Sequence, residues 1–318
     1  MTTPKHAPEL TLVIPLYNES EVLPQLLARL DAALPKLGAD TEVILVDDGS
    51  GDGTAELIDR ACRERPWCRG VMLSRNFGHQ IAVTAGMQHA RGRAVAILDG
   101  DLQDPPEVVA EFHAKLKEGY DVVYAVRRQR KEGILKRAAY ALFYRLMRAL
   151  STIPIPLDSG DFCVMSRRVV DRINAMPERH RFVRGLRSWV GYRQTGHEYP
   201  RSARAAGESK YGFSKLLKLA FDGIFTFSEA PLQWSMQFGF LVSAVSFAWG
   251  AYIVLWRLFV PGATSLPGWA TLTVGMFFLG GVQLFSIGIL GEYVGRIHNE
   301  VKGRPLFIVE RTVNFDDR

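Results

Sequence analysis

Short apolar runs alternate with longer segments of helical spacing in the first part of the chain. Such runs, rich in β-branched residues, are typical of strands buried on both faces of a parallel sheet. The predicted strands are Leu10–Pro15, Glu42–Val46, Gly70–Leu73, Ala94–Leu98 and Asp121–Val126. The predicted helices between them are Glu21–Leu37, Thr54–Arg65, Gln80–Ala90 and Pro106–Glu118. This alternation predicts an α/β fold built from βαβ units.

The pattern changes near residue 230, because from Ala230 to Gly291 the only charged side chain is Arg257. Met236–Trp256 and Trp269–Leu290 are uncharged runs of about 21 and 22 residues, or about 32 Å of helix, close to a bilayer core of about 30 Å. We therefore predict two transmembrane helices joined by a short turn. A pair of buried core helices is the alternative, but globular helices of this length normally carry a polar face.

Basic residues flank the two predicted spans unequally. Lys210, Lys215 and Lys218 precede the first span, whereas the turn holds one arginine. The residues after the second span include Arg296, Lys302, Arg304 and Arg311. By the positive-inside rule both long ends are cytoplasmic. The predicted organisation is a cytosolic domain over residues 1–229, a transmembrane hairpin over 230–293 and a cytoplasmic tail over 294–318.

Composition changes this picture little. The 318 residues are 47% hydrophobic, with 39 Lys+Arg against 33 Asp+Glu, which excludes a disordered chain. The first ten residues have no apolar stretch, so we expect no signal peptide. Cys62, Cys68 and Cys163 lack metal-site spacing, and we expect them to be reduced thiols.

Polar residues follow four predicted strands, at the edge where open α/β sheets bind ligands. The four segments are Pro15–Glu19, Asp47–Ser50, Ser74–Gly78 and Asp99–Gln103. The chain has no Gly-x-Gly-x-x-Gly after a strand and no Gly-Lys-Ser/Thr loop, so neither a dinucleotide dehydrogenase nor a P-loop NTPase is supported. Asp99 and Asp101 can share one divalent cation whose other positions hold diphosphate oxygens. A solvated acidic turn is the alternative for an isolated Asp-x-Asp, but its place after a hydrophobic strand favours the metal site.

The segment from Asp48 to Asp59 has a spacing close to that of a calcium-binding loop. However, it follows a predicted strand rather than a helix, and its twelfth residue is Asp rather than Glu. We interpret it as a strand-to-helix turn in which Asp52 caps the next helix and Asp48 is free to contact a ligand.

Seven segments of the chain form a distinctive combination. They are VIPLYNE, VDDGSGDGT, SRNFGHQIAVTAG, LDGDLQDPP, Gly160–Phe162, PERHRFVRGL and GESKYGFSKL. With the two apolar spans, they resemble the polyisoprenyl-phosphate glycosyltransferases of glycosyltransferase family two, from about Leu10 to about Val309. The resemblance implies a glycosyltransferase A fold, which is Rossmann-like with a mainly parallel sheet. It also implies inverting transfer of a sugar from a nucleotide donor to a membrane polyprenyl phosphate.

The resemblance assigns roles by position. The nucleotide donor is expected to contact Pro15, Tyr17, Asn18, Glu19, Asp48, Asn76, Gly100 and Arg127. Asp99, Asp101 and Gln103 would hold Mg²⁺ or Mn²⁺ on the diphosphate. The residues implied in catalysis are Asp99, Asp101, Asp161, Arg204 and Lys210. Arg204 and Lys210 would neutralise donor and acceptor phosphates, and a solvated basic loop attracted to anionic lipid is the alternative.

Asp158 and Asp161 are candidates for orienting the sugar or the acceptor, although Asp161 could instead cap the following turn. The family's Gly-Asp-Phe-Arg segment reads Gly160-Asp161-Phe162-Cys163 here, so the arginine of that segment is absent at this position. Gly133–Leu150 and Phe213–Phe227 each have an apolar face opposite a basic one, which predicts amphipathic helices in the membrane interface. Packing against the soluble core or another subunit is the alternative for both.

We therefore expect an enzyme of the bacterial inner membrane that uses a nucleotide sugar and undecaprenyl phosphate to modify cell-envelope glycan or lipopolysaccharide. The donor is expected to be UDP-linked, and the sugar a hexose such as glucose, because PERHRFVRGL is more similar to the bactoprenol glucosyltransferase branch than to the aminoarabinose branch. Other sugars (4-deoxy-4-formamido-arabinose, mannose, N-acetylhexosamine) and a non-catalytic binding subunit are the alternatives. The lipid bilayer is an expected partner, nucleic acid is not, and a homo-oligomer is left open.

The charge distribution predicts the topology directly. A reporter that is active only in the cytoplasm should be active when fused at Arg318, and a periplasmic reporter only when inserted near Thr264. Both fusions are measured in intact cells. Periplasmic activity at Arg318 would exclude the hairpin.

Overall fold

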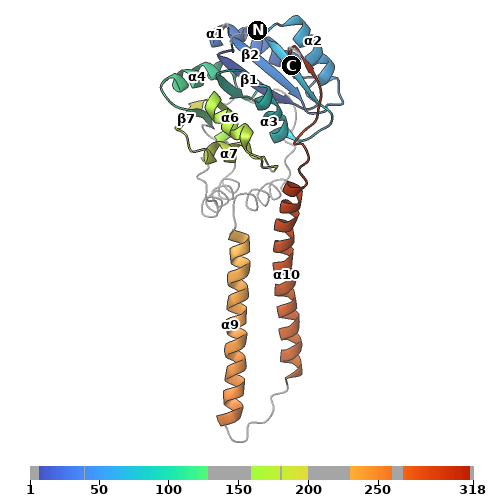
Figure 1. Ribbon diagram of the computed structural model, residues 1–318, viewed down its shortest axis with the longest axis vertical. Helices are drawn as coiled ribbons and strands as arrows, with labels where there is room; N and C mark the ends of the chain where they lie inside the picture. The colour runs from blue at the N-terminus through green and yellow to red at the C-terminus, as the bar shows by residue number, and fades with distance from the viewer. Residues whose placement is uncertain are drawn as a thin grey trace. The chain divides into compact units, whose positions relative to one another are not determined.

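The computed structural model describes residues 7–38, 40–127, 159–179, 181–199, 230–259 and 268–315. The chain divides into two compact units (Figure 1). The first contains the sheet, its covering helices and the C-terminal segment from Arg304, and the second contains two long helices.

The first unit is built on an eight-stranded sheet with the order β7-β5-β6-β4-β1-β2-β3-β8. Its strands are β1 (Leu10–Leu16), β2 (Thr41–Asp47), β3 (Cys68–Leu73), β4 (Ala94–Ile97), β5 (Val122–Arg127), β6 (Ser159–Ser166), β7 (Gln194–Tyr199) and β8 (Val309–Val313). β6 and β8 run antiparallel to their neighbours, and the other pairs are parallel. The sheet is therefore mainly parallel, as predicted.

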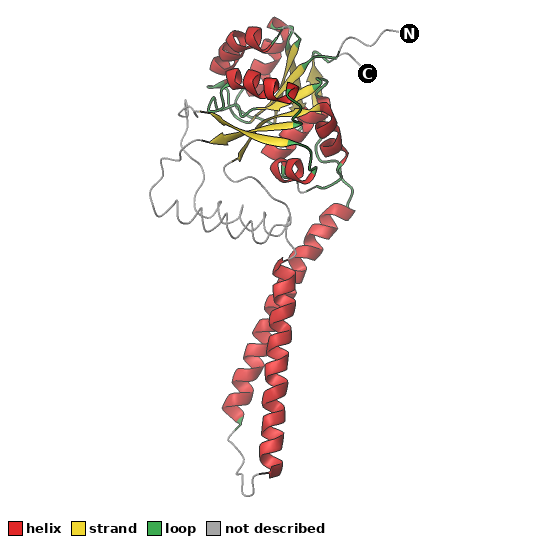
Figure 2. Cartoon of the chain, turned by 90° about the vertical axis from the view of Figure 1, so that its left-hand side faces the viewer, coloured by secondary structure: helices red, strands yellow, loops and turns green. Residues whose placement is uncertain are grey.

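Helices cover both faces of the sheet (Figure 2). They are α1 (Leu23–Leu37), α2 (Thr54–Glu64), α3 (His79–His89), a 3-10 turn η1 (Pro106–Val108) continuing into α4 (Val109–Lys117), α6 (Arg167–Ala175) and α7 (Val183–Trp189). One core cluster includes Leu23, Ile58 and Phe112 from α1, α2 and α4. The other includes residues of α3, α6 and α7. Every residue of β1 and β2 is buried, which explains the apolar runs Leu12–Leu16 and Val43–Val46 within them.

The predicted strands and helices between residues 10 and 127 are present, with ends that differ by one or two residues. The sequence pattern did not predict β6, α6, α7, β7 or β8. β8 lies in the segment predicted to be a tail, and it pairs antiparallel with the edge strand β3. Its sequence, VERTV, has three exposed polar residues between two partly buried valines, so it lacks the apolar run by which the other strands were predicted. The three cysteines are free thiols, as expected.

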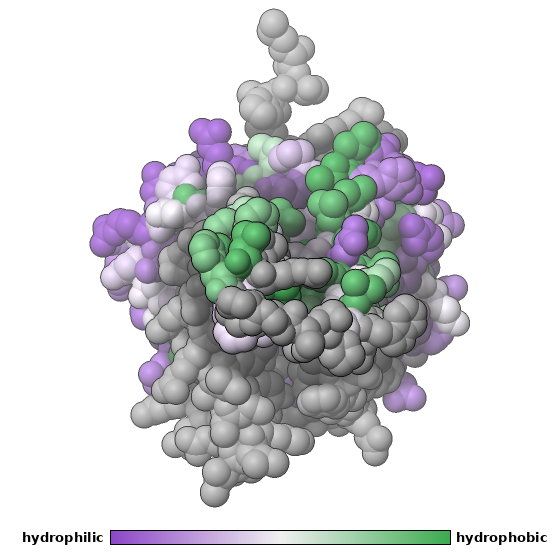
Figure 3. All heavy atoms as spheres, turned by 90° about the horizontal axis from the view of Figure 1, so that it is seen from below, coloured by the Kyte–Doolittle hydropathy of each residue, from purple (hydrophilic) through white to green (hydrophobic). Residues whose placement is uncertain are grey.

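The second unit consists of α9 (Ala230–Phe259) and α10 (Trp269–Val301). Both helices extend beyond the apolar spans predicted from the sequence. Within them, Pro231–Ile253 and Val274–Val301 are long and apolar enough to cross a membrane, and none of the most apolar window in either is buried. Large apolar side chains are exposed along both helices; Phe247, for example, is 83% exposed. Figure 3 shows apolar surface, drawn in green, on the face seen from below.

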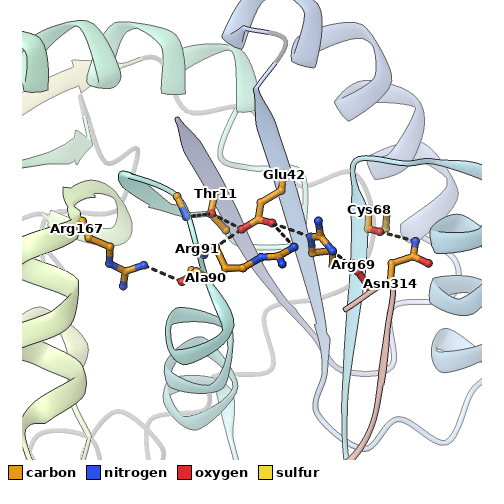
Figure 4. Close-up of polar contacts among 9 residues, drawn as sticks. Thr11, Glu42, Cys68, Arg69, Ala90, Arg91, Arg167 and Asn314 are labelled. Carbon is orange, nitrogen blue, oxygen red and sulfur yellow. Dashed lines mark hydrogen bonds and ion pairs between the residues drawn. The ribbon is translucent and has the colours of Figure 1, made fainter. Parts of the chain in front are cut away.

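The buried carboxylate of Glu42, near the start of β2, connects four parts of the sheet domain (Figure 4). Glu42 accepts hydrogen bonds from the Thr11 hydroxyl (2.7 Å), from Arg69 Nε (2.7 Å) and from the Arg91 backbone N–H (3.0 Å). Arg69 also donates to the Asn314 carbonyl. The Asn314 side chain in turn donates to the Cys68 carbonyl, at 2.9 Å. The segment after β8 is thus fastened to the sheet through Glu42.

Replacing Glu42 by Ala should lower the free energy of unfolding of the sheet domain by about 3 kcal/mol, because Arg69 and Arg91 lose a buried counter-ion. Chemical unfolding of the purified chain measures this. The control is Asp31→Ala, which removes the exposed pair with Arg65 and should cost less than about 1 kcal/mol. Equal effects of the two substitutions would contradict this role of Glu42.

Candidate active site

The loops that follow β1 and β2 are fastened to each other at the carboxyl edge of the sheet. The Asn18 N–H donates to the Ser50 hydroxyl (2.9 Å), and the Gly51 N–H donates to Asn18 Oδ1 (2.9 Å). Asn18 adopts a left-handed conformation with φ 53°, which asparagine tolerates better than most residues. The Asn18 side chain therefore shapes the loop, while its neighbour Tyr17 is 48% exposed at the rim.

Asp52 connects the same loops to the start of α2. Its carboxylate accepts hydrogen bonds from the Ser20 N–H (3.0 Å) and from the Thr54 N–H (3.1 Å). The N-cap residue of α2 is Gly53. Asp52, which was predicted to be the cap, therefore lies one residue before the N-cap position. The segment is a strand-to-helix turn, as the sequence indicated.

The Asp48 carboxylate already has two backbone partners in the structure. It is buried, and its two carboxylate oxygens accept the backbone N–H groups of Phe77 (2.7 Å) and Gly78 (2.9 Å). Burial raises the pKa of Asp48, and these two hydrogen bonds oppose the shift. Asp48 therefore holds the loop after β3 beside the loop after β2. Its contact with a nucleoside stays a prediction, as do those of Pro15, which is buried in β1, and of Glu19 and Asn76.

A glycine is required where these two loops meet. Gly49 has φ 68°, and a Cβ there would lie 2.3 Å from the carbonyl carbon of Arg75. Gly100 also lies close to β1, since a Cβ there would be 2.5 Å from Leu16 Cδ2, so a larger residue would force the Leu16 side chain to shift. The turn that carries Asp99 and Asp101 can therefore pack closely against β1.

The turn after β4 is held in a strained conformation. Leu102 has φ 62°, a left-handed conformation that is rare for a leucine. Its carbonyl accepts a hydrogen bond from Arg29 Nη1 (3.3 Å), and Asp101 Oδ1 accepts the Gln103 N–H (3.1 Å). Strained backbone of this kind is concentrated at functional sites. The structure thus presents Asp99, Asp101 and Gln103 on one tightly held turn.

The strand β6 brings Asp161 to this turn. β6 runs antiparallel to β4 with Ile97 opposite Cys163, so the same register, extended by two residues, places Asp161 opposite Asp99. His79 at the start of α3 lies between them, with Nε2 3.6 Å from Asp99 Oδ1 and 3.5 Å from Asp161 Oδ2. His79 was not among the residues predicted from the sequence, although it lies in the SRNFGHQIAVTAG segment that carried the resemblance.

Asp161 is buried and has strong partners of its own. It accepts hydrogen bonds from Arg184 Nε (2.8 Å) and Gln80 Nε2 (3.0 Å), while Gln80 Oε1 accepts the Val183 N–H (2.8 Å). Asp161 therefore does not cap the following turn; it fixes the start of α7. Gln80 and Arg184 were also missed, though Arg184 belongs to the PERHRFVRGL segment.

The two facing carboxylates differ in their electrostatics. Burial raises the pKa of Asp99 to about 6; His79 opposes this shift, whereas the nearby Asp104 and Asp161 reinforce it. Burial acts on Asp161 too, but hydrogen bonding to His79 and the charge of Arg184 hold its pKa well below the usual range. Partial burial disfavours the charged form of His79, but Asp161 and Asp99 together raise its pKa. Asp161 is therefore an ionised, compensated group, and Asp99 is the carboxylate that gains most from an added cation.

The residues of the turn fit a hard divalent cation. Asp99 Oδ1 is buried and has no hydrogen-bond partner among the described residues. Across residues 7–315, apart from the undescribed gaps, no group of three or more His, Cys, Asp or Glu side chains could hold a metal. The turn offers two carboxylates, Asp99 and Asp101, together with the predicted ligand Gln103. The remaining coordination positions of the cation would need oxygens of a bound ligand or water.

Cations from α7 lie where the family's arginine is replaced by Cys163. Arg187 is buried, lies 5.0 Å above the Tyr124 ring and donates to the Gly160 carbonyl at 3.4 Å. Burial raises the pKa of the Cys163 thiol, and Arg187 opposes that shift. The positive charge near β6 is thus supplied by Arg184 and Arg187.

Several predicted residues cannot be placed. Asp158, Arg204, Lys210 and the segments Gly133–Leu150 and Phe213–Phe227 lie outside the described residues. Arg127 is the last residue of β5, and only its main chain is described. Their expected roles stay predictions.

Comparison with known proteins identifies the family of this chain. The model of the family "Glycosyl transferase family 2" matches residues 11–173, which include all the loops described above. The chain belongs to glycosyl transferase family 2. It is therefore a glycosyltransferase, and its mixed sheet with helices on both faces is the glycosyltransferase A type of fold that the sequence predicted.

Two relatives are similar along nearly the whole chain. The glycosyltransferase YkcC of Bacillus subtilis is 42% identical over 97% of this chain and 95% of its own length. The SfII prophage-derived bactoprenol glucosyl transferase of Shigella flexneri is 39% identical over 96% of this chain and 98% of its own. A solved structure of Mycobacterium tuberculosis glucosyl-3-phosphoglycerate synthase with Mn²⁺, UDP-glucose and phosphoglyceric acid is 18% identical, with a TM-score of 0.47, over 69% of this chain and 78% of that one.

Proposed function

We propose that this protein transfers a hexose, with inversion, from a UDP-linked sugar to undecaprenyl phosphate at the cytoplasmic face of a bacterial inner membrane. The observation that carries the proposal is the end-to-end similarity to a bactoprenol glucosyl transferase, which covers the sheet domain and both apolar helices. The reaction needs a site for a sugar diphosphate and access to a lipid phosphate.

The donor site is proposed at the carboxyl edge of the sheet. Tyr17 and the loop after β2 would face the nucleoside, and Asp99 and Asp101 would bind Mg²⁺ or Mn²⁺ on the diphosphate. The cation, when bound, neutralises the charge that develops on the leaving diphosphate. The high pKa of Asp99 supports this assignment, because a neighbouring cation would favour its ionised form.

The acceptor is itself the nucleophile in this proposal. A phosphate monoester has a second pKa near about 6 and is largely dianionic at neutral pH, so it needs no protein base. Asp161 supports this view, since its carboxylate is already engaged by Arg184 and Gln80. The cations Arg127, Arg204 and Lys210 would reduce repulsion between the two phosphate groups.

The two apolar helices support a membrane location for the acceptor. The lengths and compositions of α9 and α10 suit a transmembrane hairpin, and undecaprenyl phosphate is carried by the bilayer. The alternatives are the same reaction with another sugar and a non-catalytic binding subunit. The test is incubation of the full chain, in membranes, with undecaprenyl phosphate and a panel of radiolabelled nucleotide sugars. Label should enter lipid from UDP-glucose; no lipid-linked label from any donor would refute the proposal.

Asp101→Asn should lower the turnover of that reaction at least about 100-fold, or about 3 kcal/mol at the transition state, because the metal loses one of its two carboxylate ligands. The matched control is Asp171→Asn, which removes an exposed carboxylate of α6 and should leave turnover unchanged. EDTA should abolish the turnover of the wild type, because it removes the metal. Near-normal turnover of Asp101→Asn, or of the wild type in EDTA, would show that the metal assignment is wrong.

Arg204→Ala should damage turnover more than Asp161→Asn, because the nucleophile needs charge neutralisation rather than deprotonation. The wild-type rate should also fall below about pH 6, as the lipid phosphate takes up a proton. Steady-state kinetics from pH 5 to 9 test both points, with donor binding as the check that each variant is folded. If Asp161→Asn binds donor and lipid but cannot turn over, while Arg204→Ala stays active, a carboxylate base is required.

A further inference from the structure

The turn proposed to bind the metal is tied to β7 by one buried hydrogen bond. Tyr199, the last residue of β7, donates its hydroxyl to the carboxylate of Asp104. Each of the two residues is only 2% exposed. Asp104 directly follows Gln103, so this bond acts on the same backbone that carries Asp99 and Asp101.

Contacts with the sheet, rather than with the turn, fix the position of the Tyr199 hydroxyl. β7 pairs in parallel with β5, and Tyr199 lies opposite Arg127 in that register. The Tyr199 ring packs edge-on against Phe162 of β6, with ring centres 5.5 Å apart, and Phe162 packs against Phe112 of α4 at 4.8 Å. The hydroxyl is therefore a fixed point to which Asp104 is attached.

A second anchor holds the turn from another element. Arg29 of α1 forms two hydrogen bonds of 3.1 Å with the Glu107 carboxylate, and it also bonds the Leu102 carbonyl. The left-handed residue Leu102 thus lies on a short segment that is fixed by Arg29 and by Tyr199. A strained segment persists only when its surroundings hold it, so loss of one anchor should let it relax.

We propose that Tyr199 is a positioning residue for the metal: its hydroxyl, through Asp104, holds the turn in the conformation in which Asp99 and Asp101 converge on one cation. This inference rests on the proposed function, because it takes these two carboxylates as the metal ligands. Tyr199 acts through Asp104, which is not itself one of the proposed ligands. Groups that orient metal ligands in this indirect way typically contribute 10–100-fold in metal affinity.

The experiment measures Mn²⁺ binding to the full chain in detergent with UDP present, from the electron paramagnetic resonance signal of free Mn²⁺. Tyr199→Phe should weaken Mn²⁺ binding about 10-fold. In sugar transfer, it should raise the Mn²⁺ concentration needed for half-maximal rate by a similar factor, with the rate recovering at saturating Mn²⁺. The matched control, Tyr192→Phe, removes a hydroxyl from a tyrosine that packs against Arg168 of α6, and it should bind Mn²⁺ like the wild type.

A double-mutant cycle separates the hydrogen bond from the charge of Asp104. Asp104→Ala should weaken Mn²⁺ binding by itself, and adding Tyr199→Phe to it should have no further effect, because the bond is already absent. The inference would be overturned if the effects of the two substitutions on Mn²⁺ affinity added, or if Tyr199→Phe bound Mn²⁺ as tightly as the wild type. It would also be overturned if thermal unfolding showed that Tyr199→Phe is not folded. None of these results would affect the proposed function. If the wild type binds no Mn²⁺ with UDP, the proposed metal site is wrong and this inference falls with it.

Discussion

Negative charge at the carboxyl edge of the sheet is the constraint on which the site depends. Asp104 and Asp161 are buried there and Asp99 is partly buried, and carboxylates in such proximity raise one another's pKa unless they are compensated. Asp161 is compensated by Arg184 and His79, and Asp104 accepts a hydrogen bond from Tyr199. Among the described residues, Asp99 is paired with His79, and the other charged groups that act on it are the carboxylates Asp101, Asp104 and Asp161; this is the electrostatic reason for assigning the cation to Asp99 and Asp101.

Sheet topology explains why these groups meet. In a purely parallel sheet, only residues after the strands reach the carboxyl edge. β6 is antiparallel to β4, so its first residues reach the same edge and Asp161 comes to face Asp99. β7 then adds Tyr199 on the far side of β5. The site is thus assembled from loops of the parallel strands and from one reversed strand.

The sequence predicted those parts of the site that follow directly from local pattern. Continuous apolar runs predicted β1 to β4, and the polar residues after them predicted the turn with Asp99 and Asp101. β6 could not be predicted in the same way, because SGDFCVMS mixes polar and apolar residues and its pairing partners are distant in sequence. The local pattern correctly placed Asp48 after a strand, but it could not predict the backbone partners of Asp48. Those partners, Phe77 and Gly78, depend on how two loops fold together.

The central claim is that a lipid phosphate displaces the nucleotide directly, without a covalent enzyme intermediate. The anomeric configuration of the product tests this most directly, because a single displacement inverts the anomeric carbon. The product formed from an α-linked UDP-sugar and undecaprenyl phosphate should be purified and its configuration determined by nuclear magnetic resonance. The account predicts a β-linked polyprenyl-phosphate sugar, and an α-linked product would contradict it.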